Sequence, residues 1–122
     1  MSVEARKQAA VEFLRAARRG ARAAVAPGAK HHNAYFAAGM PALIDAMMAA
    51  AKSAGMAHHG IDIRRVIGEG DMVAVHSFVT HPGAAKGISV VHIFRFESET
   101  IAELWDVGAA VPAEMPNVDG MF

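Results

Sequence analysis

The chain has 122 residues, twelve basic and twelve acidic side chains, and no cysteine. This length is typical of one domain with a substantial core. The balanced charge gives no indication of binding to nucleic acid or an anionic membrane, and the lack of cysteine excludes disulfides and thiol chemistry. No run of about eighteen apolar residues could span a membrane, and residues 1–20 lack the apolar stretch of a secretory signal, so we expect a cytoplasmic protein.

Residues 2–55 show helical periodicity in two places. Ser2 is placed to cap a first helix. The apolar stripe of this helix comprises Val3, Ala10, Val11 and Leu14. The Ala-, Gly- and Pro-rich stretch of residues 20–39 ends that helix and carries the segment KHHNAYF. A second helix is expected to start with Pro41 at its first position and to end near Gly55.

Residues 60–111 predict four strands of an antiparallel sheet. The strand segments are IDIRRVIGEG, DMVAVHSFVTH, GISVVHIFRFE and TIAELWDVGAAV, in which apolar residues mostly alternate. Helices followed by strands indicate an α+β fold. The tail, residues 112–122, ends on Met121 and Phe122, and two apolar residues at a terminus predict that the tail packs against the fold. We expect a single domain over residues 1–122.

The pairing of the strands predicts which side chains share the inner face of the sheet. A tight turn centred on residues 69–70 would set Ile63 opposite His76. A longer loop around residues 82–83 would set His76 opposite His92. The inner face would then comprise Ile61, Ile63, Ile67, Met72, His76, Phe78, Val90, His92, Phe94 and Phe96. An apolar face that is interrupted by two ionisable groups is typical of a small-molecule pocket.

The opposite face of the predicted sheet is polar but also carries apolar side chains. These are Val73, Val75, Val91 and Ile93. A sheet that is partly apolar on its outer face indicates a partner, most simply a second copy of the chain. We therefore expect a homodimer formed through this face.

The last hairpin allows two registers. A two-residue turn at residues 98–99 would put Trp105 opposite His92 and send Asp106 to the other face. One extra residue, as a longer turn or a β-bulge, would bring Asp106 to His92 instead. The sequence leaves both registers open.

Taken together, these segments resemble a known family. The chain offers a helix, a loop with His32-Asn33, a second helix and then the segments IDIRRVIGEGDMVAVHSFVT, VVHIFRFE and IAELWDV. This order and these segments are similar to the SnoaL-like polyketide cyclases, and to uncharacterised bacterial members in particular. That family belongs to the nuclear transport factor 2-like, or cystatin-like, superfamily. The resemblance implies a curved antiparallel sheet wrapped around the N-terminal helices, with a cone-shaped cavity and usually a dimer.

The resemblance also implies roles for several residues. In the characterised cyclases an Asp on the last strand is the acid/base of an intramolecular aldol closure, assisted by a His on the preceding strand. Asp106 and His92 stand at the matching positions. His32 and Asn33 resemble the family's His-Asn pair in the loop before the second helix.

These observations favour an acid–base enzyme acting on a small apolar carbonyl compound, by aldol-cyclase, isomerase or dehydratase-like chemistry. Asp106 would take a proton α to the carbonyl, and His92, with His76 or Asn33, would hold the developing oxyanion. His32 would help to orient the ligand. The pocket walls would include Trp105, Phe78 and Phe94. We expect no metal and no cofactor, since the chain has no HxH or HExxH spacing and no glycine loop that precedes a helix.

A second hypothesis is a non-catalytic protein that binds a small ligand on the same fold. Relatives in this subgroup often carry Asp at the position of His92 and His at the position of Leu104, and they usually have an aromatic residue and a proline around the His-Asn pair, which KHHNAYFAAG replaces. The departure at position 92 and the missing loop residues favour this hypothesis. A fold of this superfamily does not by itself define an activity.

Overall fold

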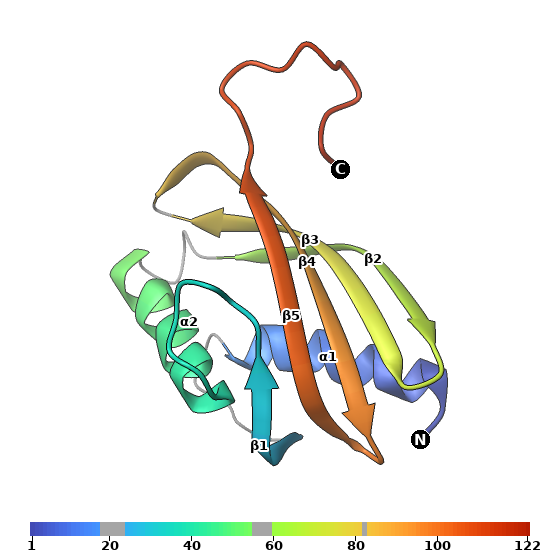
Figure 1. Ribbon diagram of the computed structural model, residues 1–122. Coiled ribbons are helices and arrows are strands. Elements are labelled where there is room, and N and C mark those ends of the chain that lie inside the picture. Colours follow the sequence, from blue (N-terminus) through green and yellow to red (C-terminus); the bar gives the residue numbers. More distant parts are fainter. Residues whose placement is uncertain (18–23, 55–59, 82) are drawn as a thin grey trace.

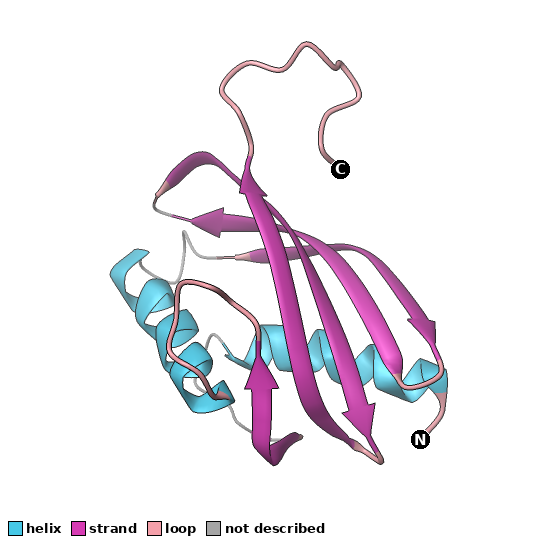
Figure 2. Cartoon of the chain, viewed as in Figure 1, coloured by secondary structure: helices cyan, strands magenta, loops and turns pink. Residues whose placement is uncertain are grey.

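The computed structural model describes residues 1–17, 24–54, 60–81 and 83–122. Two helices pack on one side of a curved five-stranded sheet (Figures 1 and 2). The elements are α1 (Val3–Ala17), β1 (Val25–His31), α2 (Met40–Ala54), β2 (Ile61–Glu69), β3 (Met72–His81), β4 (Ala84–Glu97) and β5 (Thr100–Ala110). The strand order is β1-β5-β4-β3-β2, with β1 parallel to β5 and the other neighbours antiparallel.

Strand β1 is the one element that the sequence did not predict. It lies in the stretch expected to be irregular and forms an edge of the sheet, beside β5. Pro27 and Gly28 interrupt its alternation, Gly28 has a φ of 75°, and the register shifts between Val25 and Lys30. Proline and bulges are tolerated at an edge, where one side of the strand needs no ladder partner. The predicted antiparallel sheet is thus a mixed sheet.

Helix α1 begins as predicted. The Ser2 hydroxyl accepts a hydrogen bond of 3.1 Å from the Ala5 N–H, which confirms the cap. The helix buries Ala10, Phe13 and Leu14 against the inner face of the sheet. A Cβ at Gly68 of β2 would lie 2.8 Å from Cγ1 of Val3, so glycine is what permits this close approach.

Helix α2 starts at Met40, with Pro41 in its first turn as predicted. It buries Met40, Leu43 and Ile44, while Met47 is half-buried beside them. Gly55, where the helix was expected to end, lies outside the described residues. Neither described helix is long and apolar enough to cross a membrane.

The register of β3 differs from the prediction on both sides: by one residue against β4, and against β2 by two residues next to the turn and by one beyond a bulge. Glu69 pairs with Met72, so the turn is centred on Gly70 and Asp71 and not on residues 69–70. Val75, and not His76, pairs with His92. Because side chains alternate between faces, the one-residue shift against β4 turns the whole strand over relative to His92. The inner residues of β3 are therefore Val73, Val75, Ser77 and Val79, all of them buried.

The last hairpin combines the two registers that the sequence left open. Glu97 pairs with Thr100 around a two-residue turn, in which Ser98 has a φ of 53°. A bulge then adds one residue, Ala102, and from there Asp106 pairs with His92. The bulge therefore decides that Asp106 shares the inner face with His92.

The outer face of the sheet carries the C-terminal residue. Phe122 stacks on the ring of His76, with centroids 5.5 Å apart, and meets Phe78 edge-on at 5.3 Å. The prediction that the terminus packs against the fold is thus confirmed. Ile67, Val91 and Val107 stay exposed on this face, at 65%, 36% and 72%. A homodimer through the outer face stays a prediction.

Candidate functional site

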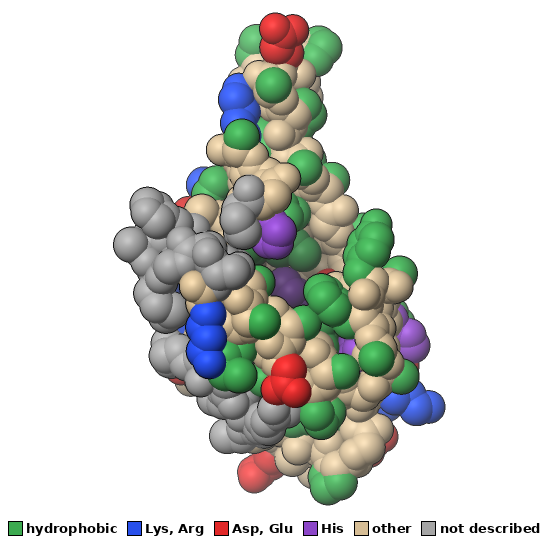
Figure 3. Space-filling model, turned by 90° about the vertical axis from the view of Figure 1, so that its left-hand side faces the viewer, with side chains coloured by type: hydrophobic (Ala, Val, Ile, Leu, Met, Phe, Trp, Pro, Cys, Tyr) green, Lys and Arg blue, Asp and Glu red, His purple; other side chains and the backbone are tan. Residues whose placement is uncertain are grey.

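A pocket of about 540 Å³ lies between the inner face of the sheet, helix α2 and the loop that follows β1. On the side of the molecule that carries α2, histidine and hydrophobic side chains border a hollow (Figure 3). The strands contribute Val79, His81, Ile88, Val90, His92, Asp106, Val107, Gly108 and Ala110. Helix α2 contributes Leu43, Ala46, Met47 and Ala50, and the loop contributes residues 32–36.

Asp106 lies beside the loop because of the topology of the sheet. Strand β1 runs parallel to β5 and ends at His31, and the ladder continues with a hydrogen bond of 2.9 Å from His32 N–H to the Leu104 carbonyl. The next residue, Asn33, donates from Nδ2 to Oδ2 of Asp106 at 3.0 Å. A segment far away in the sequence thus supplies a direct partner for the carboxylate.

The orientation of the Asn33 amide is fixed by its neighbours. Its Oδ1 accepts a hydrogen bond of 3.0 Å from the Tyr35 N–H, the arrangement of an Asx turn. The oxygen is therefore turned into the loop and the NH₂ group toward Asp106. Within the described part of the chain, Oδ1 of Asp106 has no hydrogen bond, so this oxygen is the one left for a ligand.

His92 stands directly opposite Asp106 on the adjacent strand. Residues in such cross-strand positions have Cβ atoms about 5 Å apart. The His92 side chain is almost fully buried, with 4% exposure, and its ring lies 6.3 Å from that of Phe94. A carboxylate and an imidazole on paired strand positions, and the amide that holds the carboxylate, therefore belong to the lining of a pocket whose other walls are mainly apolar.

His32 faces the opposite way from Asn33 and is held on the outer side. Its Nε2 lies 2.6 Å from Oε2 of Glu103, and its ring stacks on Trp105 with a centroid distance of 5.1 Å. The hydrogen bond with His32, followed by that with Arg95, lowers the pKa of Glu103 below its usual value. His32 borders the pocket, as predicted, but its ring nitrogen is used to fasten the loop.

Four predicted ligand contacts lie away from the pocket. His76 and Phe78 are on the outer face because β3 is shifted by one residue. Trp105 is on the outer face because the bulge turns its neighbour Asp106 inward. Phe94 points inward but is fully buried against Phe13 of α1 and does not line the pocket.

His76 has a different set of partners on the outer face. Its Nδ1 accepts a hydrogen bond from Arg65, and its Nε2 lies 2.8 Å from Oγ of Ser89. Desolvation, followed by the charges of Arg65 and Arg64, lowers the pKa of His76 below its usual value of 6.5. It therefore belongs to a surface network that includes Phe122 and not to the pocket.

Several pocket residues were not among the predicted ligand contacts, and three of them have larger side chains that face the pocket from β3 and α2: His81, Leu43 and Met47. His81 lies at the end of β3, and its Nδ1 accepts a hydrogen bond of 2.9 Å from the Gly83 N–H. Leu43 and Met47 lie on the apolar face of α2 and line the pocket from the helix. Helical periodicity identified this face of the helix but not the pocket between it and the sheet.

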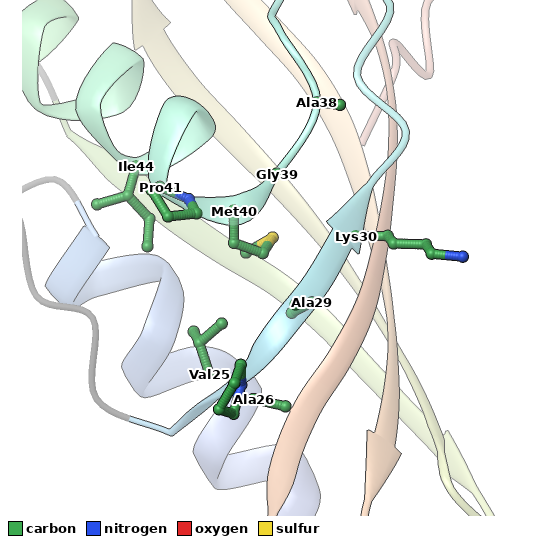
Figure 4. A pocket seen from close by; sticks show the side chains of 11 residues that line it. Val25, Ala26, Ala29, Lys30, Ala38, Gly39, Met40, Pro41 and Ile44 are labelled. Carbon is green, nitrogen blue, oxygen red and sulfur yellow. The ribbon is translucent and has the colours of Figure 1, made fainter.

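A second pocket, of about 590 Å³, lies between β1 and the start of α2 (Figure 4). Its lining is apolar apart from Lys30, whose side chain points away from the other labelled side chains. Among the described residues, no three His, Asp or Glu side chains are placed to hold a metal ion together. The pocket that contains Asp106 is therefore the better candidate for chemistry.

Comparison with known families agrees with this architecture. The sequence profile of the SnoaL-like domain matches residues 7–104. The chain belongs to the SnoaL-like domain family. The resemblance noted from the sequence is thus confirmed. No functionally curated protein matches the chain.

Solved structures show the same fold at low sequence identity. AclR from Streptomyces galilaeus, a proposed hydroxylase, has a TM-score of 0.71 at 20% identity, covering 88% of this chain and 91% of its own. A proposed ketosteroid isomerase from Kribbella flavida has a TM-score of 0.72 at 12% identity, with coverages of 94% and 85%. An epoxide hydrolase from M. tuberculosis has a TM-score of 0.62 at 16% identity, with coverages of 88% and 84%. These likenesses confirm the predicted α+β fold class, and they concern the fold alone.

Proposed function

We propose that this SnoaL-like protein is an acid–base enzyme that acts on a small, largely apolar carbonyl compound. The observation that carries the proposal is the carboxylate of Asp106, held by the Asn33 amide and opposite His92, in the lining of an otherwise mainly apolar pocket. Structural neighbours described as an isomerase and as an epoxide hydrolase support an enzyme on this fold. The chemistry proposed here uses side chains alone.

In this reaction Asp106 is the base. Its Oδ1 takes a proton from the carbon next to the carbonyl, and the electron pair of that C–H bond forms the enolate. The imidazole of His92 donates a hydrogen bond to the oxygen on which the negative charge develops. Return of the proton to another atom gives isomerisation, and attack of the enolate carbon on a second carbonyl gives aldol closure. A positioned acid–base group contributes about 10²- to 10⁴-fold to such a step.

Asp106→Asn is the decisive variant. We expect it to slow exchange of α-hydrogens for deuterium, followed by NMR in D₂O with a panel of apolar ketones, by about 10²-fold or more. This readout needs no knowledge of the product. Asp62→Asn is the matched control, because Asp62 is an exposed aspartate paired with Arg64, remote from the pocket lining. Exchange at the wild-type rate in Asp106→Asn would overturn the assignment.

A second candidate is a binding protein without turnover. It is favoured by the deep burial of His92 and by the mainly apolar lining, both of which suit retention of a ligand. Met47→Trp fills the pocket from α2 and should abolish ligand binding under either proposal. Ligand binding by the wild type with no exchange, unaffected by Asp106→Asn, would favour the binding protein.

A further inference from the structure

The side chain of His31 connects the two ends of the loop that carries Asn33. His31 is the last residue of β1 and is 8% exposed. Its Nε2 lies 2.6 Å from the carbonyl oxygen of Ala37, and its Nδ1 lies 3.1 Å from the backbone nitrogen of Asn33. The intervening residues Ala34, Tyr35 and Phe36 are exposed. One buried imidazole therefore spans this turn from the inside.

These two contacts define the form of the imidazole. A carbonyl oxygen can only accept a hydrogen bond, so Nε2 of His31 must carry the proton. The N–H of Asn33 can only donate, so Nδ1 must present a lone pair. The neutral Nε2–H tautomer satisfies both partners. A proton on Nδ1 would face the Asn33 N–H and separate the two groups.

The hydrogen bonds continue from His31 to the carboxylate. The backbone of Asn33 is held by His31, and its side-chain oxygen is held by Tyr35 N–H. With both groups fixed, the NH₂ of Asn33 is directed at Oδ2 of Asp106. Each donor and acceptor in this series is determined by its chemistry.

We propose that His31 is a positioning residue, which in its neutral Nε2–H form holds the Asn33 amide on Asp106. The proposal rests on the proposed function for its effect on catalysis. The geometric part, the hold on Asn33, can be measured without a substrate. His31 does not itself line the pocket; it contacts Asn33, which does, and it acts through that residue.

Two substitutions separate the two contacts of His31. In His31→Asn, the amide oxygen can occupy the place of Nδ1 and accept from Asn33 N–H, while the bond to Ala37 is lost. In His31→Gln, the longer amide can donate to the Ala37 carbonyl, while nothing accepts from Asn33. We expect His31→Asn to keep most of the α-hydrogen exchange rate and His31→Gln to lower it about ten- to a hundredfold, because small misplacements of reacting groups cost this much.

A double-mutant cycle tests whether the effect passes through Asn33. Asn33→Ala should lower the exchange rate, and adding His31→Gln should lower it no further. Additive losses would mean a general structural role for His31 and would overturn the proposal. Lys30→Gln is the control, because Lys30 precedes His31 on β1 and is exposed and directed away from the labelled groups in Figure 4.

A readout in the absence of substrate separates this proposal from the proposed function. The ¹H–¹⁵N signal of the Asn33 side-chain amide should shift in His31→Gln toward its position in Asp106→Ala, and stay near the wild-type position in His31→Asn. The fluorescence emission of Trp105, the sole tryptophan, should change in His31→Gln and not in His31→Asn, because His32, the neighbour of His31, stacks on its ring. An unchanged Asn33 signal in His31→Gln would overturn the hold on Asn33. A shifted signal in a protein without exchange activity would support the hold and overturn the enzyme proposal alone.

Discussion

The two faces of the sheet use similar residues for different purposes. Each face carries a histidine on a central strand, His92 inside and His76 outside, and each also carries phenylalanine side chains. His92 is almost fully buried opposite Asp106, whereas His76 is held by Arg65 and Ser89 under the ring of Phe122. Residue type alone therefore does not identify the site. The face on which a residue lies decides whether it can take part in chemistry.

The inner face should be far more sensitive to truncation than the outer face. Phe94 is fully buried and meets Phe13 edge-on at 5.8 Å, so Phe94→Ala should lower the free energy of unfolding by about 3–5 kcal/mol. Phe78 is half-buried on the outer face, and Phe78→Ala should cost about 1–2 kcal/mol. Urea denaturation of both variants checks this difference. Equal losses would mean that the faces are misassigned.

A glycine on β4 offers a second way to examine the outer face. Gly87 has a φ of 82°, and a Cβ there would lie 2.6 Å from two ring atoms of Phe78. Gly87→Ala should therefore cost about 1–3 kcal/mol, from backbone strain and displacement of the ring. Gly28→Ala is the control, because Gly28 also has a positive φ, of 75°, but open space around its Cβ position. A larger loss at Gly87 than at Gly28 in urea denaturation isolates the ring contact, and an equal loss would contradict it.

The inner face of β4 could be predicted from the sequence, but that of β3 could not. In β4, Val90, His92, Phe94 and Phe96 point inward as predicted. In β3 the segment MVAVHSFVTH is apolar on both faces, so alternation does not distinguish them. The register against β4 then decides, and the one-residue shift that pairs Val75, and not His76, with His92 reversed the strand.

The pairing of Asp106 with His92 was within reach of the sequence, but its partner Asn33 was not placed. Ile101 and Ala102 are consecutive and both buried, a break in alternation that marks the bulge. The contact of Asn33 with Asp106 depends on β1, whose Pro27 and Gly28 hide its strand pattern. Because β1 was not predicted, the sequence did not show that His31 is buried.

The C-terminal residue tests whether the outer network is independent of the pocket. Phe122 contacts His76 and Phe78, and the guanidinium of Arg64 lies 5.0 Å from its ring centroid. Phe122→Ala should lower the free energy of unfolding by about 1 kcal/mol, since each aromatic pair contributes about 0.5–1.5 kcal/mol. The α-hydrogen exchange rate should stay at the wild-type value. A large loss of α-hydrogen exchange in Phe122→Ala would mean that the outer network affects the pocket on the other face.

The smallest effect we expect is a dependence of stability on pH that comes from the outer face. Burial and the neighbouring arginines hold the pKa of His76 below 6.5 in the folded chain, so the unfolded chain binds this proton more readily. The stability linked to the neutral His76 is therefore complete above pH 6.5 and declines as the pH falls from there toward the folded-state pKa. His76→Gln should lessen the difference in urea midpoint between about pH 7.5 and about pH 5.5. If His76→Gln left the difference in midpoint unchanged, His76 would be as well solvated as a free imidazole, and the contrast between the two histidines would rest on His92 alone.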